Sequence, residues 1–104
     1  METDLDISRS EIVQSLRRLE PRLRAKGVTE LAIFGSRARG DHHPSSDLDV
    51  LISVNDNTKF SLLDLVGVSH IIGDDIGVPA NMFMKRSLDP GMKSTIQKDL
   101  IEIF

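Results

Sequence analysis

The sequence predicts an α/β fold: a small β-sheet flanked by helices, with elements in the order α-β-β-α-β-α and a short strand at the end. Three observations support this prediction. An apolar stripe at helical spacing opens the chain, short apolar runs bounded by turn residues are typical of strands, and the helical and strand-like segments alternate. The 104 residues are expected to form one domain, residues 1–104.

Residues 8–26 are expected to be helical. The apolar residues that form one stripe on this segment are Ile12, Leu16, Leu19 and Leu23. Pro21 interrupts the pattern, and a proline inside a helix costs about 3 kcal/mol. We therefore expect either a kink or two short helices, with Pro21 near the start of the second.

Strands are expected at residues 29–34, 47–54 and 80–84, and residues 100–104 could close the chain as a short edge strand. The first run stops at Gly35, a residue that commonly marks a turn. The second run alternates at first and then becomes continuously apolar, as central strands do. We therefore expect the second run to lie inside the sheet.

Two further helices are expected. Ser61 and Asp64 form a capping box at the start of the apolar segment 61–72, and this box and the length favour a helix over a buried strand. The residues expected to share its buried face are Leu62, Leu65, Val66, Ser69 and Ile72. The dipeptide Asp-Pro at 89–90 is typical of an N-cap and the first helical residue, and it predicts a helix over about 90–99.

The composition argues against several classes of protein. There is no cysteine, so neither a disulfide framework nor a thiolate metal site is available. The net charge of -3 argues against broad binding to nucleic acid or membrane surfaces. No run approaches the roughly 18 apolar residues that span a bilayer. The sequence lacks tyrosine and tryptophan, which usually stack single-stranded nucleic acid. We expect a cytoplasmic protein that contacts neither a membrane nor long nucleic acid directly.

Two aspartates lie at the start of the second predicted strand. Residues i and i+2 of a strand point to the same face, about 6.6 Å apart, so Asp47 and Asp49 should point together while Leu48 faces the core. Two carboxylates this close repel each other unless a cation lies between them. Mg²⁺ prefers oxygen ligands and shares phosphate oxygens, and pairs of such ions serve phosphoryl transfer. The pattern predicts Asp47 and Asp49 as ligands of a two-ion Mg²⁺ site.

A glycine-serine turn precedes these aspartates in the chain. Gly35 lets a phosphate approach the backbone closely, and the Ser36 hydroxyl can donate to a phosphate oxygen. A helix starting at Ser36 would point its first N–H groups at the same anion. Arg37 and Arg39 follow, and guanidinium groups suit phosphate, although a solvated turn is the alternative interpretation. The turn therefore predicts a triphosphate-binding segment.

The segment "GSRARGDHHPSSDLDV" resembles the signature of the minimal nucleotidyltransferases: a glycine-serine pair, ten residues, then Asp-x-Asp. These proteins form the MNT family within the polymerase-β-like nucleotidyltransferase superfamily. The resemblance covers nearly the whole chain. A leading amphipathic helix, a helix at "SLLDLVG", a strand at "GVPANM" and a final helix at "LDPGMKSTIQKDL" all match the family's layout.

The resemblance implies a nucleotidyltransferase (polymerase-β palm-like) fold with a small mixed β-sheet flanked by helices. It also implies Gly35 and Ser36 on the triphosphate and Asp47 and Asp49 as catalytic Mg²⁺ ligands. It implies transfer of a nucleoside monophosphate, with ATP as the expected substrate. Many minimal members resemble the antitoxins of HEPN/MNT toxin–antitoxin pairs, some of which adenylylate a tyrosine of their HEPN ribonuclease partner. A HEPN-type protein partner, and hence a hetero-oligomer, is therefore expected.

One position departs from the family's pattern. The superfamily usually carries a third carboxylate on a later strand, and this chain has Asn81 there. An amide oxygen is a neutral, weaker metal ligand, and it cannot act as a general base. Asn81 is therefore expected at the third catalytic position, although a polar residue on a solvent-facing strand is the alternative. Two functions stay open: an enzyme with weak transfer activity, and a catalytically impaired subunit that binds nucleotide or its partner.

Overall fold

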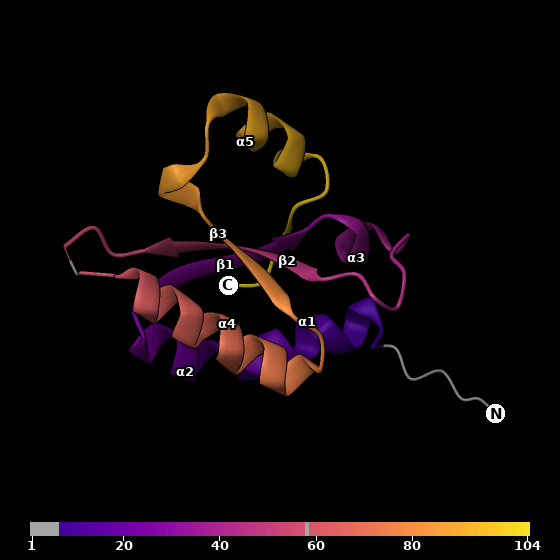
Figure 1. Ribbon diagram of the computed structural model, residues 1–104, viewed down its shortest axis with the longest axis horizontal. Coiled ribbons are helices and arrows are strands. Elements are labelled where there is room, and N and C mark those ends of the chain that lie inside the picture. Colours follow the sequence, from indigo (N-terminus) through magenta and orange to yellow (C-terminus); the bar gives the residue numbers. More distant parts are fainter. Residues whose placement is uncertain (1–6, 58) are drawn as a thin grey trace.

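The computed structural model describes residues 7–57 and 59–104 and is built around a four-stranded mixed sheet in the order β3-β2-β1-β4. The strands are β1 (Val28–Phe34), β2 (Leu48–Val54), β3 (Ala80–Met84) and β4 (Ile101–Glu102). β1 runs antiparallel to both β2 and β4, whereas β3 runs parallel to β2. The predicted mixed sheet flanked by helices is confirmed, and the short C-terminal strand lies at one edge of the sheet (Figure 1).

Three helices cover one face of the sheet (Figure 1). They are α1 (Arg9–Arg18), α2 (Glu20–Ala25) and α4 (Leu62–Ile76). The break between α1 and α2 leaves Pro21 as the second residue of α2, where a helix needs no backbone hydrogen bond from that position. The two-helix alternative is thus confirmed. The predicted apolar stripe is buried in the main core: Ile12, Leu16, Leu19 and Leu23.

Helix α4 begins with the predicted capping box, in which the Ser61 N–H donates to Asp64 Oδ2 at 2.8 Å. The predicted buried face is wrong in part, because Leu62 is 75% exposed and Val66 is 42% exposed. The residues of α4 that are buried are Val68, Ile72 and Ile76. At 3.6 residues per turn, Val66 lies about 120° around the helix from Ile72, and so points away from the sheet. No helix in the described part of the chain is long and apolar enough to cross a membrane.

The second face of the sheet is covered by α5 (Pro90–Gln97), which follows the short 3₁₀ helix η1 (Lys85–Ser87). The Asp89 side chain accepts a hydrogen bond from the Met92 N–H at 2.7 Å, so the predicted Asp-Pro start of this helix is confirmed. A second, smaller core under α5 consists of Phe34, Leu51 and Ile96. Figure 1 shows α5 on the opposite side of the sheet from α4. The residues of β2 that alternate with the main core therefore face α5.

Candidate functional site

The glycine-serine turn and the aspartate strand meet at one end of the sheet. β1 leads into α3 (Ser36–Arg39), a single helical turn that begins at Ser36. Phe34 pairs with Asp49 in the β1–β2 ladder, which brings the residue after Phe34 beside the Asp49 side chain. Gly35 has a φ of 79°, and a Cβ atom there would overlap the Asp49 carboxylate. The close approach of the turn to the strand therefore requires glycine.

Asp49 faces the α5 side of the sheet, because its neighbours Leu48 and Val50 are buried in the main core. Burial raises the pKa of the Asp49 carboxyl; the hydrogen bond from Asn81 lowers this pKa, the charge of Asp47 raises it further, and the charge of Arg39 lowers it. Asp47 lies one residue before β2 and is exposed. The two carboxylates thus act on each other electrostatically at the edge of solvent, an arrangement that suits a bound cation.

Asn81 lies directly beside Asp49 in the parallel β2–β3 ladder. Its side chain is exposed, and its Nδ2 donates to Asp49 Oδ1 at 3.3 Å. The Asn81 amide donates a hydrogen bond to Asp49, whereas a third carboxylate at this position would repel the two aspartates. The sequence prediction that Asn81 belongs with the aspartates fits this geometry, although its catalytic role stays a prediction.

The position of Arg37 does not fit the prediction that it contacts the nucleotide. Its side chain is fully buried. Arg37 Nε donates to the Ser46 carbonyl at 2.8 Å, and Nη2 donates to the Pro44 carbonyl at 3.1 Å. Both carbonyls belong to the loop that leads to Asp47. Arg37 therefore holds the loop through these hydrogen bonds and does not face a ligand. Loop carbonyls that have no strand partner need such donors.

Arg39 is exposed and points to the other side of α3. Its Nη1 lies 2.7 Å from Asp99 Oδ2, and its Nε lies 3.1 Å from Asp41 Oδ2. The hydrogen bond to Asp41 contributes most to the raised pKa of the Arg39 guanidinium, and the hydrogen bond to Asp99 contributes next. Of the two arginines predicted to bind phosphate, Arg39 is thus the one whose charge is accessible beside Ser36 and Asp49.

A cleft of about 530 Å³ lies between α5 and the end of the sheet where Phe34 pairs with Asp49. Three of the predicted site residues lie outside its lining: Arg37, Asp47 and Asn81. The predicted residues in its wall are Gly35, Ser36, Arg39 and Asp49. The facing wall comes from the segment around α5, with Met92, Thr95, Ile96 and Asp99. Sequence reasoning did not single out these α5 residues, although their spacing of three, one and three is that of one helix face. The cleft brings together the turn predicted to bind an anion, the Asp49 carboxylate and a helix face that the motif does not include.

The carboxylate oxygens of Asp47 and Asp49 suit a hard divalent cation that takes its other ligands from a substrate. Within residues 7–57 and 59–104, no group of three or more histidine, cysteine or acidic side chains could hold a metal by itself. Asp47 and Asp49 supply oxygen ligands, and Mg²⁺ usually fills its remaining positions with water and substrate phosphates. These two residues would hold the ion only weakly without a phosphate ligand, so metal and triphosphate are expected to bind together.

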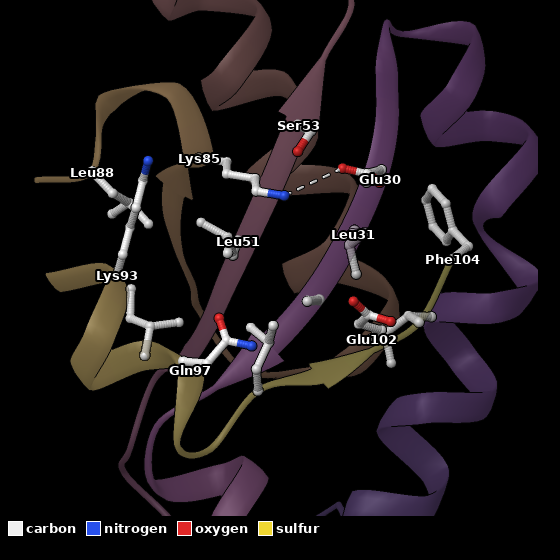
Figure 2. Close-up of a pocket in the computed structure, with 14 residues that line it drawn as sticks. Glu30, Leu31, Leu51, Ser53, Lys85, Leu88, Lys93, Gln97, Glu102 and Phe104 are labelled. Atoms are coloured by element: carbon white, nitrogen blue, oxygen red, sulfur yellow. Dashed lines mark ion pairs between the residues drawn. The ribbon is translucent and has the colours of Figure 1, made fainter. Parts of the chain in front are cut away.

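A second cavity of about 540 Å³ lies on the same sheet face, along the other flank of α5 (Figure 2). The residues that line it include Ser53 of β2 and Gln97 of α5, which are labelled in Figure 2. Lys85 Nζ and Glu30 Oε1, also in the lining, form an ion pair at 3.8 Å. Ile96 contributes to both cavities, and its packing on Phe34 and Leu51 separates them. None of the site residues predicted from the sequence lines this second cavity.

Comparison with known proteins identifies the family. The family model described as nucleotidyltransferase domain matches residues 10–103. A Methanocaldococcus jannaschii protein, provisionally named a protein adenylyltransferase, is 36% identical over 96 residues, which cover 90% of this chain and 96% of that protein. The chain therefore belongs to the nucleotidyltransferase domain family.

Solved structures with the same fold are similar in shape and distant in sequence. One, provisionally described as a minimal nucleotidyltransferase, has a TM-score of 0.76 and 22% identity, and the match covers 94% of this chain and 98% of that chain. Another is the tri-AMPylated Shewanella oneidensis HEPN toxin in complex with MNT antitoxin. It has a TM-score of 0.63 and 12% identity, with 88% of this chain and 71% of that chain covered. At these identities the likeness establishes the fold.

Proposed function

We propose that this chain is a Mg²⁺-dependent nucleotidyltransferase that transfers AMP from ATP to a HEPN-type toxin and so acts as its antitoxin. The observation that carries the proposal is the contact between the Gly35 turn and the Asp49 carboxylate, which joins the anion-binding and metal-binding halves in one cleft. The Methanocaldococcus adenylyltransferase and the MNT–HEPN complex support the nucleotide and the partner by similarity.

Each residue has a distinct role in this proposal. Asp47 and Asp49 hold the metal, which supplies neutralising charge to the phosphate oxygens. The Ser36 hydroxyl donates to a phosphate oxygen, and Gly35 allows the phosphate to approach the backbone. Arg39 adds a positive charge at the same end of the cleft. Arg37 acts indirectly, because it holds the loop that carries Asp47.

The transfer step forms one bond and breaks another. A hydroxyl oxygen of the acceptor bonds to the α-phosphorus of ATP, the bond from that phosphorus to the bridging oxygen breaks, and pyrophosphate leaves. Asn81 cannot accept the hydroxyl proton, because its amide is not a base at neutral pH. The proton therefore passes to solvent, which is expected to make the reaction slower than with a carboxylate at this position.

The second candidate function is a catalytically impaired antitoxin that binds nucleotide or its partner without transfer. Asn81 is the observation that favours it, since the amide occupies the place beside Asp49. Incubating the chain with Mg²⁺-ATP and the HEPN-type partner, followed by mass spectrometry, separates the two functions. An adenylyl group on the partner is expected. A stable complex with no added mass would favour the binding function and contradict transfer.

Restoring a carboxylate beside Asp49 should raise activity. We expect Asn81→Asp to increase the rate of AMP transfer at least tenfold, because a third oxygen ligand and a base enter the site. Without metal the same variant should be less stable than wild type, since the Asn81–Asp49 hydrogen bond is replaced by repulsion. Transfer assays and thermal unfolding with and without Mg²⁺ test both effects. Equal transfer rates in the two proteins would show that Asn81 does not limit catalysis.

A further inference from the structure

One face of α5 forms a wall of the nucleotide cleft, and its two ends differ in chemistry. Asp99, just after the helix, pairs with Arg39 at 2.7 Å and so marks the end of the cleft where Ser36 and Arg39 lie. Met92 lies seven residues earlier, which corresponds to about 10 Å along a helix. The wall therefore runs from the anion-binding end to a point well beyond the reach of a single phosphate.

Met92 is also distinguished by its exposure. Among the described residues that line the cleft, three have large apolar side chains: Phe34, Met92 and Ile96. Phe34 and Ile96 are 8% and 4% exposed, because they pack against each other in the second core. Met92 is 38% exposed, so its thioether is the apolar group that a ligand in the cleft can contact.

We propose that Met92 forms the nucleoside subsite of this cleft and packs against the face of the nucleobase. This inference rests on the proposed function, since it assumes that a nucleoside triphosphate fills the cleft. A flexible, polarisable thioether is well suited to contact an aromatic ring. With the phosphates at Ser36 and Arg39, the base extends along α5 toward Met92. The residue recognises the base, and the turn recognises the phosphates.

Comparing two ligands tests this division of roles. Calorimetry is run with Mg²⁺-ATP and with Mg²⁺-tripolyphosphate, which has the phosphates and no base. We expect Met92→Ala to raise the Kd for ATP about fivefold to tenfold and to leave the Kd for tripolyphosphate unchanged. Met92→Leu keeps an apolar contact and should recover most of the affinity for ATP. Leu63→Ala on α4 removes an 82% exposed apolar side chain outside the cleft and should change neither Kd.

Two results would overturn the inference while the proposed function stands: an ATP affinity unchanged by Met92→Ala, or equal losses for ATP and tripolyphosphate. The second result would mean that the substitution disturbs the cleft as a whole, and thermal unfolding of each variant measures that disturbance. Wild-type protein that binds neither ligand in the presence of Mg²⁺ would contradict the proposed function itself, and the nucleoside subsite with it.

Discussion

Replacing Asp47 and Asp49 together by asparagine is expected to lower AMP transfer at least about 100-fold, which corresponds to about 2.7 kcal/mol of transition-state stabilisation. The amides keep the shape of the side chains and remove both charges that we propose hold the metal. ATP should then bind with the same affinity in the presence and absence of Mg²⁺. In wild type, by contrast, ATP affinity should rise strongly with Mg²⁺, because carboxylates in the cleft repel an uncompensated triphosphate. Calorimetric titrations with and without Mg²⁺ measure the difference.

The matched control removes two carboxylate charges at positions away from the cleft. Asp74 and Asp75 are adjacent exposed residues near the end of α4, and neither lines the cleft that contains Asp49. The double replacement of Asp74 and Asp75 by asparagine should leave transfer and Mg²⁺-dependent ATP binding intact. If the Asp47 and Asp49 double variant behaved like this control, the metal ligands would have to be sought at other residues.

The second large effect is expected for Arg37→Met, which should reduce the free energy of unfolding by about 2–4 kcal/mol. The methionine keeps much of the side chain's length and removes the donors to the Ser46 and Pro44 carbonyls. These buried hydrogen bonds come from a charged group, and the loop to Asp47 loses its support when they are removed. Urea unfolding measures the stability. Faster amide exchange in residues 40–47 would report the loosened loop.

Arg39 provides the comparison, two residues along the same helical turn. Arg39→Met removes exposed ion pairs to Asp41 and Asp99, which contribute little to stability in water. We expect this variant to unfold like wild type and to bind Mg²⁺-ATP more weakly. The opposite pattern, with Arg37→Met as stable as wild type and deficient in ATP binding, would restore the sequence-based role of Arg37 as a phosphate ligand.

Local sequence signals accounted for most of the fold. The capping box at Ser61, the Asp-Pro start of α5 and the break at Pro21 were predictable because caps and prolines act through backbone groups a few residues away. The buried face of α4 was harder, because apolar residues occur all around the helix near Leu62. Hydrophobicity then gives no direction, and only the sheet that packs on the helix decides which side is buried.

The candidate site likewise contains residues that the sequence could place and residues that it could not. Gly35, Ser36, Asp49 and Asn81 lie together because β1, β2 and β3 are neighbours, an arrangement that the motif's spacing and family resemblance could anticipate. An arginine beside a glycine-serine turn is naturally interpreted as a phosphate ligand. Nothing in the sequence indicates that carbonyl groups of the following loop need the donors of Arg37. Met92 was not singled out from the sequence, because its position over the cleft depends on how α5 folds back onto the sheet.

The sheet also implies an order of assembly during folding. β1 ends at Phe34 and has two partners at very different distances along the chain: β2 begins at Leu48, whereas β4 begins at Ile101. Contacts between nearby segments form sooner than contacts that close a long loop. The antiparallel β1–β2 pair is therefore expected to form first, and this pair with its connection already contains Gly35 and Asp49. The centre of the site thus forms while the remaining sheet edge is still open, before residues 101–102 pair with β1.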